Sequence, residues 1–201
     1  MSTETTISKD ACSATVIRGA GTKEDASPGG YYTAECYDEN GNLKWSDYIN
    51  NVVTDTGRNH MLGVQFRSVS QVTAWYIGLI SSVKGANNYA TVANTDTQAS
   101  HSNRGQANSN NAPNYSQTSL RLVTFAAAAT KAIASSNATV FSITGSGTVK
   151  GAFLTSNPNK SNAGAGPTTG TLYSAGLFTG GDKVVQNGDT LNVSYTTVLG
   201  G

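Results

Sequence analysis

A β-hairpin signal constrains the fold of this chain more than any other feature. Asn40-Gly41 separates two segments that carry most of the nearby aromatic residues, 31–37 and 42–49. Asn and Gly both tolerate positive φ, as the two central positions of a type I′ turn require, and that turn matches the twist of paired strands. Side chains alternate along a strand. On the second segment they place one set in the core: Leu43, Trp45 and Ile49.

The rest of the chain continues the strand pattern. Residues 72–80 and 172–178 are apolar on both faces, as central strands are. Alternation elsewhere predicts strands with inward side chains at Leu120 and Leu122, at Phe141 and Ile143, at Val149, Gly151 and Phe153, and at Leu191, Val193 and Tyr195. The chain holds 26 Thr, 22 Ser, 22 Gly and 19 Asn in 201 residues, a composition of strand and turn formers. About eight strands without helical crossovers predict an antiparallel β-sandwich of the jelly-roll kind.

One short helix and an N-terminal arm complete the expected architecture. Thr54 can cap a helix whose spacing puts three apolar side chains on one side, those of Met61, Leu62 and Phe66. Residues 1–30 lack a sustained period and end in Pro28-Gly29-Gly30, interpreted as a hinge, so the arm precedes a single domain over 31–201. Two long polar loops are expected, 81–117 and 156–170. The first would cross the surface or reach a neighbouring molecule.

The charge balance argues against two classes of partner. Thirteen Lys and Arg face 12 Asp and Glu, so no excess of positive charge favours nucleic acid or an anionic membrane. No apolar run is long enough for a membrane span, and the first residues lack a signal peptide, so we expect synthesis in the cytoplasm. Cys12 and Cys36 are then expected to be reduced, with a single bridge between them as the alternative.

Few residues could support catalysis. His60 stands in the expected helix, where a packed histidine is the ordinary reading. The segment 96–101 contains the residue types of a hydrolase triad, but six consecutive residues cannot bring nucleophile, base and orienting acid into mutual contact. Glu35 and Asp47 could face each other across the hairpin as the two carboxylates of a glycosidase. Any two surface residues of the hairpin could face each other in the same way, so the pair does not indicate that activity. Metal-binding spacings of Cys and His are absent, so we expect no enzyme, no cofactor and no metal site.

The remaining candidates concern binding. Tyr31, Tyr32 and Tyr37 could stack on a sugar or a partner, or could simply cover the sheet. Val16 and Ile17 form an apolar patch in the arm that could add to a sheet edge of a neighbour. We therefore expect partner contacts at Val16, Ile17, Tyr31 and Tyr32. Trp45 and Trp75 are expected in the core, and three lysines are expected as isolated surface residues, Lys150, Lys160 and Lys183.

Several short segments, taken in order, resemble small structural proteins of tailed-bacteriophage virions. The resemblance begins at Trp75–Ile80 and extends over roughly residues 31 to 198. The other segments that carry it are 41–45, 51–54, 57–60, 96–97, 99–101, 147–154, 170–178 and 188–195. After Ala99-Ser100-His101 the family pattern has Gly-Trp and an acidic residue, whereas this chain has Ser102-Asn103-Arg104-Gly105. That departure falls inside the first long loop.

The resemblance implies a virion component without a catalytic site. Its most direct implication is a capsid decoration, or cement, protein on the outside of the major capsid shell. A tail or head-fibre component, including a receptor-binding module, is the alternative. The implied partners are the major capsid protein and further copies of this chain, because closed cyclic assemblies are common and a trimer matches the threefold points of a capsid lattice.

Overall fold

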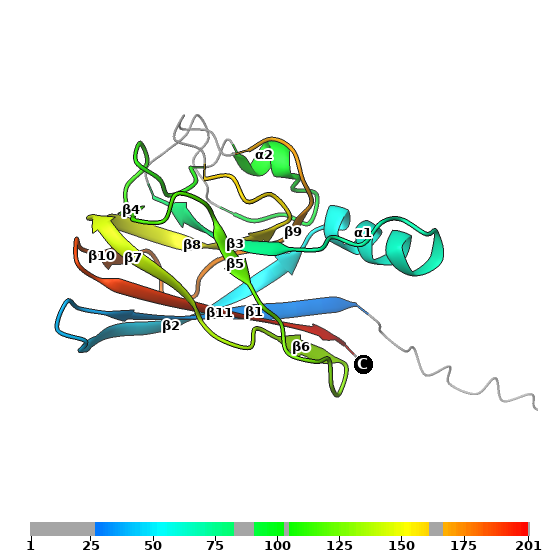
Figure 1. The fold of residues 1–201 in the computed structure, drawn as a ribbon, viewed down its shortest axis with the longest axis horizontal. Helices are drawn as coiled ribbons and strands as arrows, with labels where there is room; N and C mark the ends of the chain where they lie inside the picture. Colours follow the sequence, from blue (N-terminus) through cyan, green and yellow to red (C-terminus); the bar gives the residue numbers. More distant parts are fainter. Residues whose placement is uncertain (1–26, 83–90, 103–104, 161–166, 201) are drawn as a thin grey trace, which may run out of the picture.

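A computed structural model describes residues 27–82, 91–102, 105–160 and 167–200. The described part is dominated by antiparallel strands that form one large curled sheet, a half-barrel (Figure 1). Its strands are β1 (Pro28–Tyr37), β2 (Leu43–Val53), β3 (Trp75–Ser81), β4 (Asn114–Tyr115), β5 (Arg121–Val123), β6 (Ala132–Ala134), β7 (Thr139–Gly145), β8 (Gly147–Thr155), β9 (Leu172–Phe178), β10 (Lys183–Val185) and β11 (Thr190–Leu199). The helices are α1 (Asp55–Phe66) and α2 (Gln98–Ser102).

The sheet runs in the order β4-β7-β11-β1-β2-β9-β8-β3-β5, with β10 paired to β8 and β6 to β11. The predicted all-antiparallel β class is confirmed, with eleven strands in the described residues in place of about eight. The two separate sheets of a sandwich are not distinguished, because hydrogen-bonded neighbours connect the strands into one sheet. Curling, which follows from strand twist, lets this single sheet enclose its own core.

The first hairpin forms where the sequence predicts it, with a different turn. β1 and β2 pair antiparallel from Tyr31 opposite Asn50 onward. Gly41 has φ +84, but Asn40 is not among the residues with positive φ, so the turn is not of type I′. The Asp38 carboxylate organises it instead, because Oδ1 accepts from the backbone N–H groups of Asn40 at 2.9 Å and Asn42 at 2.8 Å.

Of the three hairpin side chains expected inside, only Ile49 is fully buried. Trp45 is partly buried and packs against the core, with its Nε1 donating to the Val184 carbonyl at 3.0 Å. Leu43 is exposed, so its placement in the core was wrong. It lies at the turn end of β2, whereas β9 covers only the stretch Ile49–Val53.

Three central strands are covered on both faces. β8 lies between β3 and β9, and their side chains divide between two apolar clusters. The main core fills the concave side and includes the fully buried Ile77, Phe141 and Tyr195, together with the partly buried Trp75. The second cluster lies under the loops and contains Ile80, Leu120, Phe153, Leu172 and Ala175. This confirms the prediction of two strands that are apolar on both faces, with the bounds of 172–178 as expected, whereas β3 begins at Trp75 and not at residue 72.

Two of the expectations for the C-terminal half were wrong. Phe141, Ile143, Leu191, Val193 and Tyr195 are buried as predicted, but Val149 lies in the main core and Phe153 in the second cluster, because β8 bulges between them. Leu120 is buried too, but Leu122 is 54% exposed, while Val123 points inward. Leu120 precedes β5 and donates its backbone N–H to the Pro158 carbonyl, so it does not continue the alternation of that strand.

The helix α1 begins as predicted but turns a different face to the domain. Thr54 is its N-cap, accepting from the Gly57 N–H at 3.1 Å and donating to the Leu172 carbonyl. Met61 packs against the core, and the Tyr173 hydroxyl lies 3.2 Å from its sulfur. Leu62 and Phe66 are exposed, so the expectation that all three side chains lie on one side was wrong. Successive helical residues are about 100° apart, which separates Met61 from Leu62.

The described parts of the first long loop lie against the domain itself. Ala107 and Tyr115 join the main core, and Gln106, Asn108 and Asn111 are buried. The Asn108 side chain accepts from the backbone N–H groups of Asn110 and Asn111 at 2.8 and 2.9 Å, which folds this polar run into a turn. The loop therefore covers one face of β3 and β8 and, with α2, forms the upper layer in Figure 1.

Candidate functional site

The two hairpin tyrosines expected at a partner surface lie on opposite faces of the sheet. Tyr32 is fully buried, its hydroxyl within 2.7 Å of Ser174 Oγ and its ring 4.6 Å from that of Tyr195. Its assignment as a binding residue was wrong, because the folded domain encloses the ring. Tyr31 is half-buried and stacks on Tyr48 at 5.1 Å between ring centroids, with the rings 27° from parallel. The Tyr31–Tyr48 pair is therefore the aromatic surface of the hairpin that remains a candidate for partner contact.

The other two candidates, Val16 and Ile17, lie outside the described residues. The expected hinge does not: Pro28, Gly29 and Gly30 belong to β1 and pair with Leu199, Val198 and Thr197. A Cβ on Gly30 would approach the Thr196 carbonyl oxygen to 2.5 Å, so glycine permits close contact between strands there and does not serve as a hinge. The ordered sheet thus begins three residues before the predicted boundary.

The histidine candidates show no catalytic arrangement in the described residues. The His60 ring packs edge-on against Trp75, with centroids 6.0 Å apart. Asp96 accepts from the Ala93 N–H at 3.0 Å within its turn, and Ser100 bonds to Thr97. Gln98 donates to the Pro167 carbonyl and accepts from the Thr155 hydroxyl at 2.6 Å. These bonds attach the segment to the end of β8, and the His101 side chain lies outside the described part.

The carboxylates proposed as a glycosidase pair do not face each other. Glu35 lies opposite Ser46 in the register, and accepts from the Tyr37 hydroxyl at 2.7 Å, a bond that raises the pKa of Tyr37. Asp47 instead pairs with Lys183 at 2.7 Å and accepts from Thr179 and from the Tyr48 and Gly180 N–H groups. The hydrogen bonds from these neighbours hold the pKa of Asp47 below its usual range against the opposing effect of burial. Lys183 is therefore no isolated surface residue.

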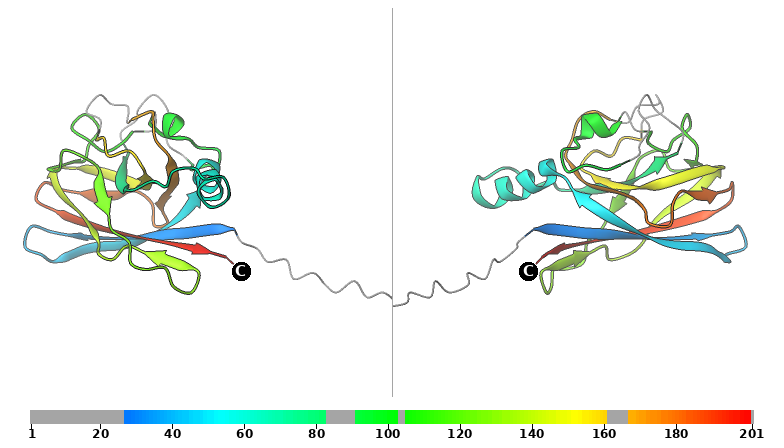
Figure 2. Two further views of the ribbon diagram at one scale, coloured as in Figure 1. Left: turned by 45° about the vertical axis from the view of Figure 1, so that its right-hand side comes forward. Right: turned by 180° about the vertical axis from the view of Figure 1, so that it is seen from behind.

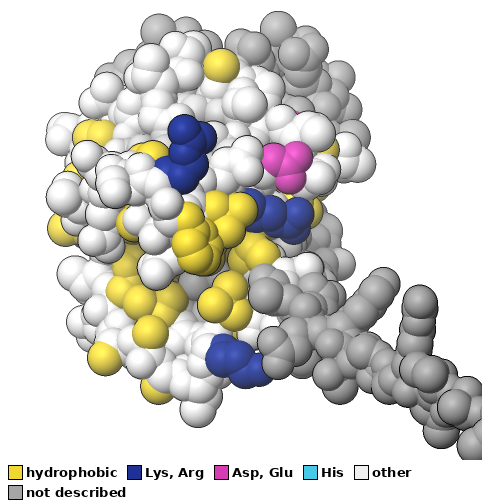
Figure 3. Space-filling model, turned by 90° about the vertical axis from the view of Figure 1, so that its right-hand side faces the viewer, with side chains coloured by type: hydrophobic (Ala, Val, Ile, Leu, Met, Phe, Trp, Pro, Cys, Tyr) yellow, Lys and Arg dark blue, Asp and Glu magenta, His cyan; other side chains and the backbone are white. Residues whose placement is uncertain are grey.

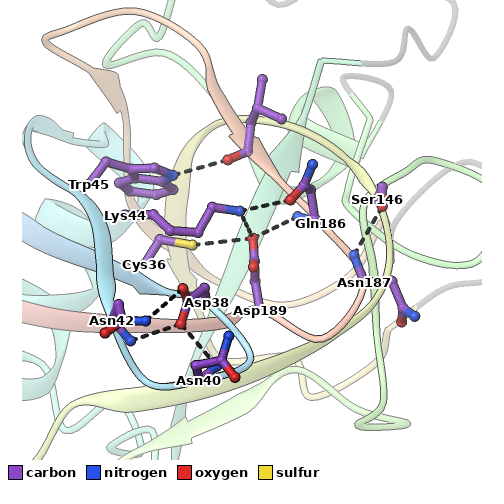
Figure 4. Close-up of polar contacts among 11 residues, drawn as sticks. Cys36, Asp38, Asn40, Asn42, Lys44, Trp45, Ser146, Gln186, Asn187 and Asp189 are labelled. Carbon is purple, nitrogen blue, oxygen red and sulfur yellow. Dashed lines mark hydrogen bonds and ion pairs between the residues drawn. The ribbon is translucent and has the colours of Figure 1, made fainter.

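A polar cluster links the first hairpin to the turn before β11. The Asp189 carboxylate is buried and accepts from Lys44 Nζ at 2.6 Å and from the Gln186 N–H at 2.7 Å (Figure 4). The Cys36 thiol lies 3.7 Å from the same Oδ2 atom. The Gln186 bond closes the turn that contains Asp189, and Lys44 adds an ion pair between β2 and that turn. The cluster is internal and offers no open site.

Cys36 is a free, buried thiol, and it gives a test at alkaline pH. Burial and then the nearby Asp189 charge raise the pKa of Cys36 from 9.0 to about 12. An acid with a raised pKa in the folded state stabilises the fold below its unfolded pKa and loses that contribution as pH rises through the folded pKa. We expect this thiol to lower the free energy of unfolding by up to about 1.4 kcal/mol per pH unit above pH 9.

Urea unfolding of the parent and of Cys36→Ala, at pH 7, 9 and 10 under reducing conditions, measures this effect. Burial also raises the pKa of Tyr115 and of Tyr195, so both proteins weaken at still higher pH. The loss between pH 9 and 10 should be smaller in Cys36→Ala than in the parent. Equal losses in the two proteins would contradict the prediction.

Lys160 joins two loops and was wrongly expected as an isolated surface residue. Its Nζ donates to Asn114 Oδ1 at 2.8 Å and to the carbonyls of Tyr115 at 2.6 Å and Gln117 at 3.0 Å. It also lies 3.7 Å from the centroid of the Tyr115 ring. Burial lowers the pKa of Lys160 to about 8, while the acceptor oxygens and the ring favour its charged form. A pocket of about 380 Å³ adjoins it, lined by Thr118, Ser119, Asn159, Lys160 and Pro167.

Exposed apolar side chains gather at the free end of α1. Leu62, Phe66 and Val69 are 56%, 76% and 47% exposed. We call these three residues the α1 apolar face. Figure 3 views the molecule from the side on which α1 projects and shows hydrophobic side chains collected there. Exposed apolar patches of this kind often mark interaction surfaces.

The sequence pattern singled out Leu62 and Phe66, together with Met61, as apolar side chains on one side of the helix. Their i, i+4 spacing shows that they share a face, and only tertiary structure shows which way that face points. The contacts of Lys160 had no sequence signal, since its acceptors are mainly backbone carbonyls from a segment more than forty residues away. The Lys44–Asp189 pair likewise joins residues 145 positions apart.

Within the described ranges, no three side chains of His, Cys, Asp or Glu gather so as to hold a metal ion. None of the helices in those ranges is long and apolar enough to cross a membrane.

No protein-family model matches the chain, and no curated protein matches it.

Proposed function

We propose that this protein is a non-enzymatic structural component of a tailed-bacteriophage virion, a decoration protein that binds the outside of the major capsid shell. The observation that carries the proposal is a contrast between charged side chains, which bond within the domain, and exposed apolar side chains. Several described carboxylates and lysines act as internal links, as at Asp189 and Lys160. The exposed groups include the α1 apolar face. Such a surface suits binding better than catalysis.

The proposed partners are the major capsid protein and other copies of this chain, in a homotrimer. A subunit that binds a lattice of identical sites needs little affinity per contact, because linked copies raise the effective concentration of one another. Val16 and Ile17 are the proposed contacts in the N-terminal segment. The near balance of 13 basic and 12 acidic residues supports a partner that is neither nucleic acid nor membrane. The protein would be made in the host cytoplasm and reside in the virion, without a cofactor.

The finer fold assignment belongs to the same proposal. We treat the curled sheet as a relative of the jelly roll whose two halves remain joined. The pairing of β11 with both β1 and β7 supports this, because it carries the sheet around the main core.

A tail or head-fibre component, with a receptor-binding role, is the second candidate. The exposed stacking of Tyr31 on Tyr48 favours it, because flat aromatic pairs are common contact surfaces for sugars and proteins. This surface lies on the hairpin and is separate from the α1 apolar face. The two candidates therefore predict loss of binding from different substitutions.

Immunogold labelling of native particles with an antibody to this chain tests the location. Label over the icosahedral faces supports decoration, and label confined to the tail or to fibres supports the second candidate. If the particles carry no label and mass spectrometry detects no copies of this chain in them, both candidate functions are refuted. The antibody should be checked on particles from a strain that lacks the gene for this chain.

Cosedimentation with particles that lack the protein tests attachment. We expect the full chain to bind, and a chain that begins at Ser27, which keeps β1 whole, to fold but lose most of its attachment. Tyr31→Ala with Tyr48→Ala is the matched surface control and should bind capsids normally. Equal attachment of the shortened chain would remove Val16 and Ile17 from the interface. Failure of the full chain to bind would count against decoration.

A further inference from the structure

The α1 apolar face is unusual because the helix carries it away from the domain. Gly57 is the point of closest approach, where an added Cβ would lie 2.6 Å from the Tyr173 carbonyl oxygen. Met61 packs against the core, and the free end of the helix projects from the body of the molecule (Figures 1 and 2). Leu62 and Phe66 are one turn apart on its outer side. Nothing in the described residues covers them.

The end of α1 makes these side chains into one continuous surface. The Val69 N–H donates to the Gly63 carbonyl at 3.1 Å, which turns the chain back onto the helix. Val69 Cγ2 lies 3.0 Å from the position of a Cβ on Gly63, so valine packs where the glycine leaves space. Leu62, Phe66 and Val69 therefore expose neighbouring apolar groups that would be more stable out of water.

The N-terminal segment enters the sheet beside this helix. Tyr31 pairs with Asn50, so the start of β1 at Pro28 runs alongside the end of β2 at Val53. α1 begins two residues after that end, at Asp55. Both views in Figure 2 place the start of β1 and α1 at the same end of the sheet. The N-terminal segment therefore joins the described domain at the end from which α1 projects.

The length of the linker in that segment matches the distance it must cover. The apolar stretch Ala14–Ile17 is separated from Pro28 by residues 18–27, ten residues that include Gly19 and Gly21. A linker of that length has a root-mean-square span of roughly 16 to 19 Å. The 12 residues of α1 extend about 18 Å from its base to Phe66. A linker of this average span is therefore long enough to reach along α1 from the end of the sheet where the helix begins, which keeps the effective concentration of Ala14–Ile17 at the apolar face high.

We infer that Ala14–Ile17 of the same chain docks on the α1 apolar face in the free protein. The inference goes beyond the proposed function and does not depend on it. Docking would remove Leu62, Phe66 and Val69 from water before the protein meets any partner. It also predicts that any partner of this face must first displace a segment of the chain itself.

The cysteines of the chain permit a direct test. Cys36 is buried and its thiol is held in the neutral form, so a nitroxide maleimide at pH 7 should attach at Cys12 alone. Methyl NMR spectra of the labelled full chain are recorded before and after the nitroxide is reduced. We expect loss of the Leu62 and Val69 methyl signals in the oxidised sample only. The Val184 signals should persist, because Val184 is exposed and its strand, β10, lies at the end of the sheet away from α1 (Figure 1).

Two matched variants separate docking from random proximity. Leu62→Ser with Phe66→Ser should restore the Val69 methyl signals in the oxidised sample, whereas Val184→Ser should leave them lost. All substituted side chains are exposed, so both proteins should keep the chemical shifts of the core. Retained Val69 signals in the oxidised parent, or continued loss in the double variant, would overturn the inference.

A mixed sample tests whether the contact is within one chain. Isotope-labelled Cys12→Ser protein is combined with unlabelled protein that carries the nitroxide. We expect the Leu62 and Val69 signals to persist in this mixture. Their loss would assign the face to the segment of a second copy and overturn docking within the chain. Because no particle is present, none of these outcomes depends on whether the protein decorates a capsid.

Discussion

Gly151→Ala is expected to lower the free energy of unfolding by about 3 kcal/mol or more, which is roughly 10 °C in Tm for a domain of this size. A Cβ at Gly151 would lie 1.9 Å from the carbonyl oxygen of Gly176. Both residues lie in paired strands, since β8 hydrogen-bonds to β9 on one side and to β3 on the other. No side-chain rotation can relieve the overlap, so the strands themselves must separate.

Gly29→Ala is the matched control. Gly29 also lies in a strand, but the nearest atom to its added Cβ is Val198 Cγ2 at 3.8 Å, an ordinary contact. Replacing glycine by alanine without strain reduces the entropy of the unfolded chain, so this variant should be as stable as the parent or slightly more stable. Thermal unfolding of the two variants, followed by circular dichroism, compares them. A Tm for Gly151→Ala close to that of Gly29→Ala would contradict the prediction.

The glycines show which part of the fold the sequence could predict. Gly151 lies where β8 bulges against β3, since Ile80 pairs with Gly151 and Ser81 with Val149. The alternation pattern predicted buried side chains at Val149 and Phe153, but not that the bulge sends them to different clusters. A glycine within a strand can signal a close approach of another backbone, but the sequence does not name the partner. Gly176 illustrates this, because its added Cβ would meet Ile49 Cγ2 at 2.4 Å, on a strand more than a hundred residues away.

The strands were predictable because their signals are local. The bounds of β9, Leu172–Phe178, were predicted from its apolar run alone. The arrangement of the strands was not, because β1 lies between β2 and β11 from the other end of the chain, and no alternation pattern specifies that pairing. Eight or eleven alternating strands can form two packed sheets or one curled sheet with the same inward side chains.

The binding surface was less predictable than the fold. Tyr31 and Tyr32 are adjacent, so a strand must place them on opposite faces, and only the observed register identifies Tyr32 as the buried one. Leu62 and Phe66 have the spacing of a core-facing helix. Their exposure follows from the position of α1, which contacts β9 through Gly57 and Met61 and leaves the opposite side uncovered.

Lys44→Met is expected to lower the free energy of unfolding by about 3 kcal/mol, because it leaves the buried Asp189 carboxylate without its counter-charge. Lys44 Nζ lies 2.6 Å from Asp189 Oδ2, and that carboxylate is 4% exposed. The Gln186 N–H at 2.7 Å would remain its main hydrogen bond. Methionine preserves the aliphatic stem of lysine, so the loss reports mainly the charge.

Lys183→Met tests whether the local hydrogen bonds decide the size of such a loss. The Asp47 carboxylate is 9% exposed and pairs with Lys183 at 2.7 Å, but it keeps bonds from the Tyr48 N–H, the Thr179 hydroxyl and the Gly180 N–H. The loss should therefore be smaller than for Lys44→Met. Adding Asp189→Asn to Lys44→Met should recover part of the stability, because an amide is less costly to bury than a carboxylate without a counter-charge. Urea unfolding at pH 7 measures all four proteins. A loss in Lys183→Met equal to that in Lys44→Met, or no recovery in the double variant, would show that the buried charge of Asp189 does not set the cost.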